Sequence, residues 1–140
     1  MSQKIRAVAL SVIKNQNGQI LVEPSYDATK EEKFYRPLGG GIEMGETGTE
    51  TIKREIMEEL GVDVTTGERL CVIENIFTYE GQLGHEIMLV YPCSFTDFDL
   101  YNQDEIPLIE QKNRAVVWRS PTEIEEEGAV LHPGEIISYL

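Results

Sequence analysis

The sequence has 140 residues, 41% of them hydrophobic and 26% charged, which is typical of a globular protein with one domain over residues 1–140. No apolar stretch is long enough to cross a bilayer, so a membrane protein is not expected. The formal net charge of −13 would repel phosphate backbones, which argues against binding to a nucleic acid polymer.

The N-terminus and the cysteines indicate a cellular compartment. Residues 1–6 run directly into a strand-like segment and lack the apolar core and cleavage site of a secretory signal. Cys71 and Cys93 lie in apolar runs, which is typical of buried free thiols. We therefore expect a cytoplasmic protein.

The first part of the chain is strand-rich. Residues 6–13 and 19–23 have strand patterns on either side of a turn at 15–18, which predicts a β-hairpin. Residues 24–35 are polar and show no clean period, so we expect a loop. A short strand then leads through three consecutive glycines, within residues 36–43.

Residues 47–60 form the clearest predicted helix. Thr47 can cap the N-terminus and Glu50 completes a capping box, while Gly61 is the expected left-handed stop. An apolar stripe recurs every four residues: Ile52, Ile56 and Leu60. This stripe predicts that one face of the helix packs against a sheet.

The second part of the chain alternates strands with irregular structure. Strands are expected over 70–79, 86–95 and 115–119, and the segment 96–113 is acidic and irregular. A capping box that starts at Ser120 predicts a short second helix. One long and one short helix among several strands indicate a mixed α/β sandwich.

Three carboxylates lie on the arc beside the buried stripe of the long helix: Glu55, Glu58 and Glu59. The ordinary interpretation is a solvated acidic face that Lys53 and Arg54 relieve. Two features favour a metal site instead. The carboxylates border the apolar arc, and the glycine turn at 39–41 lets a backbone carbonyl approach a ligand closely. Such a set of hard oxygens suits Mg²⁺ or Mn²⁺.

The spacing around this helix is specific. Gly40, five residues, Glu46, seven residues and then Arg-Glu-Ile-Met-Glu-Glu-Leu-Gly-Val at 54–62 resemble the complete signature of the Nudix hydrolase family, with every fixed position matched. The order of the flanking elements also resembles a Nudix domain. The resemblance implies a Nudix-type α/β/α sandwich with a mixed sheet, in which Glu46 matches a structural acid at the junction of loop and helix.

The resemblance also implies a role for each catalytic candidate. Glu58 and Glu59 match the family's metal-binding carboxylates, and the carbonyl of Gly40 matches one that can contact the metal. Glu55 matches either a further metal ligand or the base that deprotonates the attacking water. Arg54 matches an arginine that orients these carboxylates through charge-assisted hydrogen bonds.

The implied function is a pyrophosphohydrolase that requires Mg²⁺ (or Mn²⁺). Its substrate would be a nucleoside diphosphate linked to another moiety: a nucleoside triphosphate, ADP-ribose, a nucleotide sugar or a dinucleoside polyphosphate. Two other classes remain as alternatives, namely a non-catalytic nucleotide-sensing Nudix-like module and an acidic structural domain without a ligand. The resemblance leaves a homodimer open, since many members of the family dimerise.

Four charged residues outside the signature are candidate substrate contacts: Lys33, Arg36, Glu86 and Glu110. Lys33, Arg36 and Glu110 each have a surface loop position as the ordinary alternative, and Glu86 could contact either substrate or metal. If Lys33, Arg36 and Glu110 do not contact substrate, the strands around Phe77, Tyr79 and Glu86 are the next candidates. Trp118 ends an apolar strand and is expected in the core.

Overall fold

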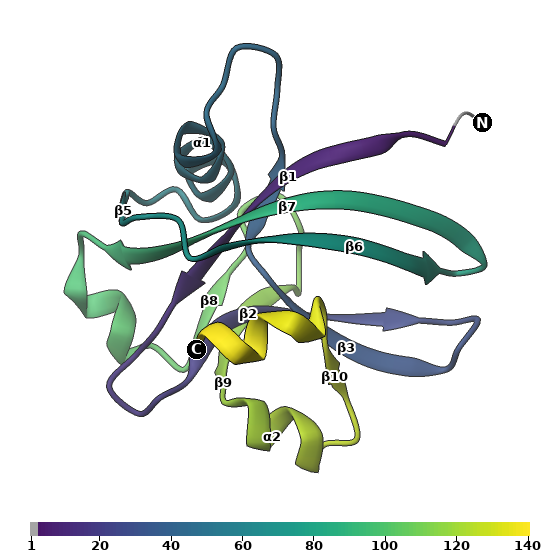
Figure 1. Ribbon diagram of the computed structural model, residues 1–140. Helices are drawn as coiled ribbons and strands as arrows, with labels where there is room; N and C mark the ends of the chain where they lie inside the picture. The colour runs from purple at the N-terminus through teal and green to yellow at the C-terminus, as the bar shows by residue number, and fades with distance from the viewer. Residues whose placement is uncertain (1–2) are drawn as a thin grey trace.

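The computed structural model describes residues 3–140, which form two sheets with helices packed outside them (Figure 1). Part of the prediction about a secretory signal falls on residues 1–2, which lie outside the described residues. The predicted α/β class is confirmed. Each of the two sheets contains both parallel and antiparallel strand pairs.

The first sheet is built around two long parallel strands, β1 (Ile5–Ile13) and β7 (Gln82–Phe95). β4 (Gly39–Gly41) pairs with the other edge of β1. β5 (Val64–Thr66) and β6 (Cys71–Tyr79) both pair antiparallel with the remaining edge of β7. Every residue of β1 from Val8 onward is buried, which is why it takes a central place in the sheet.

The second sheet has the order β10 (Val130–Leu131), β3 (Glu32–Pro37), β2 (Ile20–Asp27), β9 (Ala115–Arg119) and β8 (Glu105–Pro107). β10 pairs parallel with β3, and the other neighbours are antiparallel. The hairpins β2–β3 and β6–β7 extend in the same direction, one above the other, on the right of Figure 1.

Two predictions for the first part of the chain are wrong. β1 and β2 do not form a hairpin, because β1 pairs with β4 and β7 while β2 pairs with β3 and β9. The turn at 15–18 instead carries the chain from one sheet to the other, with a single bridge between Lys14 and Ile20. Residues 24–35 are not a loop either, since they supply most of the β2–β3 hairpin.

The two α-helices begin as predicted. In α1 (Gly48–Leu60) the Thr47 side chain accepts a hydrogen bond from the N–H of Glu50 in a capping box, and Gly61 ends the helix at φ 71°. α2 (Pro121–Glu126) has the capping box that starts at Ser120. Short 3₁₀ helices are η1 (Phe98–Asn102) and η2 (Gly134–Tyr139). No helix among the described residues has the length and apolar composition needed to span a membrane.

Apolar side chains bury themselves in two clusters. The first packs the predicted stripe of α1 (Ile52, Ile56 and Leu60) against both sheets, and it contains Trp118 and Cys93. The second cluster joins the two sheets to α2 and η2. Cys71 is half-buried, so the prediction of a buried thiol holds for Cys93 only, and both cysteines are free.

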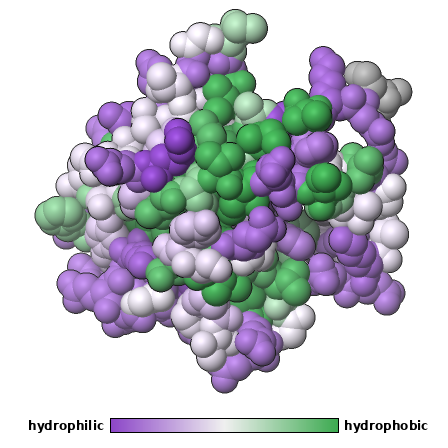
Figure 2. Space-filling view, in the orientation of Figure 1, coloured by the Kyte–Doolittle hydropathy of each residue, from purple (hydrophilic) through white to green (hydrophobic). Residues whose placement is uncertain are grey.

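One part of the first sheet is not covered. Beyond α1, four apolar side chains lie on the same face of β1, β6 and β7 and form what we call the apolar strip: Ile5, Val72, Ile76 and Leu83. Between 49% and 65% of each remains exposed. Figure 2 shows hydrophobic atoms gathered on this face beside α1.

Candidate active site

Arg54 on α1 joins the loop before the helix to the carboxylates on the helix. Its Nε and Nη2 donate to the two carboxylate oxygens of Glu46 at 2.7 and 3.0 Å. Its Nη1 donates to Glu55 at 3.0 Å and to Glu58 at 3.5 Å, and Nη2 also donates to the carbonyl of Gly41 at 3.2 Å. One planar guanidinium therefore fixes the positions of three acids and the glycine turn.

Glu46 is held ionised at the junction of loop and helix. The hydrogen bond from Arg54 is the main cause that lowers the pKa of Glu46 to about 2. The N–H of Glu43 and the hydroxyl of Thr51 also donate to this carboxylate, at 3.1 and 2.9 Å. Since its oxygens are already used in these contacts, Glu46 serves as an anchor for Arg54.

Gly40 lies directly against Glu55. A side chain at residue 40 would overlap with the carboxyl group of Glu55, so this approach requires a glycine. Pairing of Gly40 with Ala9 of β1 fixes the backbone on the other side. The carbonyl-bearing turn and the first carboxylate of the helix are thus held in contact.

Glu59 borders the buried stripe of α1, as expected. Its Oε2 is buried and accepts no hydrogen bond from any group within residues 3–140. Burial is the main cause that raises the pKa of Glu59 to about 7, and the negative charges of Glu55, Glu23 and Glu58 raise it further, while Arg36 opposes them. A buried carboxylate oxygen without a donor is stabilised most simply by a cation.

The donor set fits a divalent metal, although it is not preassembled. Across residues 3–140, no three His, Cys, Asp or Glu side chains converge as a ready-made metal cluster. Glu55 and Glu58 instead turn toward Arg54, which is the cation within their reach. The carbonyl of Gly40, these two carboxylates and the unpaired oxygen of Glu59 are the hard oxygen donors that Mg²⁺ or Mn²⁺ prefers.

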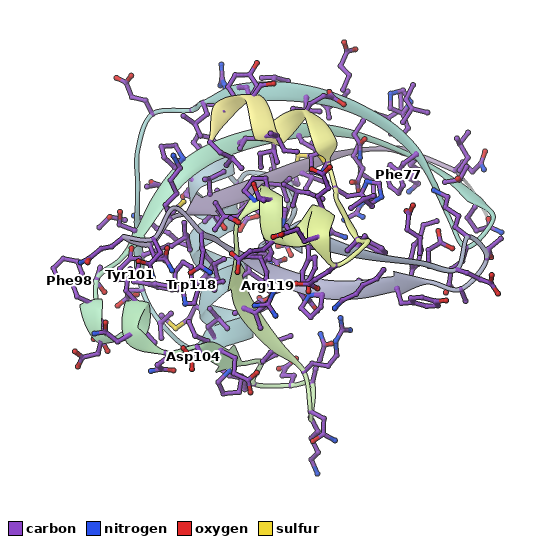
Figure 3. All side chains as sticks on the ribbon, turned by 90° about the horizontal axis from the view of Figure 1, so that it is seen from below. Phe77, Phe98, Tyr101, Asp104, Trp118 and Arg119 are labelled. Atoms are coloured by element: carbon purple, nitrogen blue, oxygen red, sulfur yellow. The ribbon has the colours of Figure 1, made fainter. Side chains whose placement is uncertain are left out.

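A cavity of about 340 Å³ lies between the hairpins β2–β3 and β6–β7. Phe34 and Tyr79 face each other edge-on across it, with ring centroids 5.9 Å apart, and Phe77 adds a third ring. Figure 3 shows Phe77 on this side of the molecule, away from the other labelled aromatic residues. Because its walls are aromatic and its volume is that of a small-molecule site, the cavity suits a flat ligand.

A buried acid in the lining of this cavity, Asp27, joins the tips of the two hairpins. Asp27 at the tip of β2–β3 accepts hydrogen bonds from the N–H groups of Thr29 and Lys30 at 3.0 and 3.1 Å, and of Glu80 at 3.2 Å. The ammonium group of Lys30 also donates to the carbonyl of Thr78 at 2.9 Å. These contacts fasten the tips of the two hairpins to each other.

Arg36 connects the cavity with the carboxylates of α1. It lines the cavity, and it is the cross-strand partner of Glu23. Its charge also acts on Glu59, whose pKa it lowers. Arg36 is therefore the predicted substrate contact that lies between the two parts of the site.

The other three predicted substrate contacts lie in different parts of the structure. Glu86 is buried in the wall of the cavity. Glu110 is exposed, but the neighbouring N–H of Ile109 donates to the carbonyl of Glu59 at 2.9 Å, so its segment lies against the end of α1. Lys33 lies apart from the others: it points to the opposite face of β3, where its ammonium lies 3.1 Å from a carboxylate oxygen of Glu127.

Trp118 lies in the core, as predicted, and takes no part in the cavity. Its ring stacks on Tyr101 with centroids 5.6 Å apart, and its Nε1–H donates to the carbonyl of Gln103 at 2.9 Å. Figure 3 shows Trp118, Tyr101 and Phe98 together at the end of the molecule opposite Phe77.

The sequence interpretation missed most of the residues that line the cavity, among them Arg6, Phe34 and Asn75. One signal could have identified Asn75. In β6, Ile73, Asn75 and Phe77 are two residues apart, so all three side chains lie on the same face of the strand.

A family model described as the NUDIX domain matches residues 4–140. The chain belongs to the Nudix family. The match includes the glycine turn, α1 and both hairpins of the cavity, so the implied Nudix-type fold is confirmed.

Many known proteins are similar to this Nudix chain, among them the following three. It is 32% identical over 68 residues to an 8-oxo-dGTP diphosphatase of Haemophilus influenzae and 39% identical over 56 residues to one of Escherichia coli. Those segments cover 49% and 39% of this chain but only 50% and 43% of the two relatives. The chain also aligns with the crystal structure of a MutT NUDIX hydrolase from Burkholderia pseudomallei over 99% of each chain, at 20% identity and with a TM-score of 0.69. At this identity the similarity shows a shared fold.

Proposed function

We propose that this Nudix protein is a metal-dependent pyrophosphohydrolase, carried by one domain, that cleaves a nucleoside diphosphate derivative by attack of water at phosphorus. The observation that carries the proposal is the buried, unpaired Oε2 of Glu59 beside two carboxylates that Arg54 holds. A surface acidic helix would not keep a carboxylate oxygen in this state.

The metal would be held by the carbonyl of Gly40 and by Glu55, Glu58 and Glu59. A bound divalent cation would neutralise the phosphate oxygens, lower the pKa of the attacking water and stabilise the leaving group. Glu55 either completes this ligand set or takes the proton of the water. Its contact with Gly40 and its hydrogen bond from Arg54 hold the carboxylate in one place for either task.

The remainder of the substrate would extend from these carboxylates into the cavity. Arg36 would donate to phosphate oxygens on the way, because it lines the cavity and its charge reaches Glu59. The rings of Phe34 and Phe77 would contact the faces of the base. Both curated relatives are 8-oxo-dGTP diphosphatases, which favours a nucleoside triphosphate among the candidate substrates.

The decisive experiment is turnover by metal-free protein on a panel of a nucleoside triphosphate, its 8-oxo form, ADP-ribose, a nucleotide sugar and a dinucleoside polyphosphate. Hydrolysis should appear with Mg²⁺ or Mn²⁺, stop with EDTA and release a nucleoside monophosphate. Full activity in excess EDTA would refute the metal mechanism. Thermal stabilisation by a nucleotide without any turnover would indicate the sensor alternative instead.

A further inference from the structure

Three polar side chains cross the wall of the cavity in one row. Arg6 of β1 is the register partner of Glu86 in β7, and Glu86 is in turn the partner of Asn75 in β6. Residues paired across neighbouring strands project to the same face of a sheet. All three line the cavity, with Glu86 in the middle of the row.

Glu86 is only 7% exposed, although it is a carboxylate in an otherwise apolar strand face. The guanidinium of Arg6 donates to its Oε2 at 3.2 Å, and the Arg6 side chain is itself 59% exposed. Within residues 3–140, Oε1 of Glu86 accepts no hydrogen bond. Oε1 is not among the buried oxygens that lack a partner, so it reaches the open space of the cavity, where the N–H or O–H group of a ligand can donate to it.

The surroundings show what kind of molecule could bring those donors. Phe34 and Phe77 come from the two facing hairpins and offer aromatic surface to a flat ring. Asp27 and Glu32 add negative charge to the same cavity, so a phosphate group would be repelled from its interior. A nitrogen heterocycle with N–H donors on its edge matches both properties.

We infer that Glu86 is a specificity-determining residue that accepts hydrogen bonds from two adjacent N–H donors of a guanine-type base. The inference rests on the proposed function in one respect, that a nucleotide places its base in this cavity. Guanine carries N1–H and the N2 amino group side by side, and a carboxylate can accept from both. The amide of Asn75 or the guanidinium of Arg6 would donate to O6 of the same edge.

Other bases fit this acceptor less well. Adenine and cytosine each present a ring nitrogen lone pair beside their amino group, and that lone pair would face a second acceptor. Uracil and thymine offer a single N–H between two carbonyl oxygens. Oxidation of guanine at C8 leaves the N1 and N2 donors unchanged, so Glu86 selects guanine over adenine without separating oxidised from ordinary guanine.

Binding of GMP and AMP to the folded, metal-free chain tests this inference by calorimetry, independently of turnover. The wild-type chain should bind GMP at least about tenfold more tightly than AMP, because a mismatched edge leaves the buried acceptor unpaired. Glu86→Gln keeps the size but offers one donor and one acceptor, which complements adenine. It should weaken GMP binding by about tenfold or more and remove or reverse the preference.

Glu74→Gln is the matched control. Glu74 is exposed on β6 one residue before Asn75, so it projects to the face away from the cavity, and its loss of charge is the same. This variant should bind both nucleotides like the wild type. Equal weakening of GMP and AMP by Glu86→Gln, or a wild-type chain without base preference, would overturn the inference.

Two further outcomes are informative. A GMP preference that depends on Glu86 in a protein that hydrolyses no nucleotide would support this inference and refute the proposed function. If Glu86→Gln does not fold, Glu86→Asp replaces it. Its shorter carboxylate should lower GMP affinity while GMP remains preferred over AMP, and a loss of that preference would count against the inference.

Discussion

A Cβ atom at residue 40 would overlap with the carboxyl group of Glu55, so the glycine turn and the signature helix leave no room for a side chain between Gly40 and Glu55. Gly40→Ala should push this carboxylate out of place and lower kcat/KM by about 10–100-fold, since small displacements of reacting groups carry such losses. Steady-state kinetics against Mg²⁺ concentration is the measurement. Gly134→Ala, where a methyl group meets nothing within 4 Å, should leave the rate unchanged.

Arg36 and Lys33 make a matched pair, because they lie three residues apart on β3 and point to opposite faces. Arg36→Ala should raise KM by about tenfold to hundredfold, the loss expected for one shielded charged contact of about 1.5–3 kcal/mol. Lys33→Ala should leave KM close to the wild-type value, since Lys33 contacts Glu127. Kinetics on one nucleoside triphosphate measures both, and equal effects would show that Arg36 does not meet the phosphates.

Removing the charge of Glu59 should lower the catalytic rate but raise the stability of the metal-free protein. Glu59→Gln should lower kcat by about 100-fold or more, because a charge that would hold the metal is lost. The melting temperature of the metal-free protein should rise, since repulsion from Glu55 and Glu58 is relieved. Glu126→Gln, on the exposed side of α2, serves as the control. Near-normal turnover would mean that Glu59 is not a ligand.

Acid should weaken the contact between α2 and the second sheet. Hydrogen bonds from Tyr35, Lys33 and Arg119 hold the pKa of Glu127 at about 2, below its ordinary value of 4.5. A depressed pKa adds stability that is complete above the unfolded-state value and is lost as the pH falls toward 2. Urea unfolding at pH 7 and pH 3 should therefore show a smaller decrease for Glu127→Gln than for the wild type, by about 1 kcal/mol after solvent screening.

The signature helix could be predicted because its information is local. Thr47, Glu50 and Gly61 specify its ends, and the four-residue recurrence of Ile52 and Ile56 specifies its buried face. The position of Arg54 beside the acids followed from the family resemblance.

Strand pairing could not be predicted, because its information is not local. The turn at 15–18 has the same sequence whether its strands pair with each other or join different sheets, and the true partner of β1 is β7. In β3 the two faces are both partly polar, since Phe34 and Arg36 face the cavity while Lys33 faces α2. Because both faces of β3 carry polar residues, the alternation of polar and apolar residues by which a strand is normally detected is absent, and the sequence does not show that Lys33 and Arg36 lie on opposite faces.

The apolar strip over Ile5, Val72, Ile76 and Leu83 has a practical consequence for handling the protein. At neutral pH a net charge of −13 keeps copies apart despite this uncovered surface. Near the isoelectric pH of about 4.5 that repulsion disappears, and the strip, which ends at the unpaired edge of β6, becomes the first surface through which chains adhere. Colloidal stability should therefore fail at mildly acidic pH before the fold does, and turbidity should appear while circular dichroism still reports native strands.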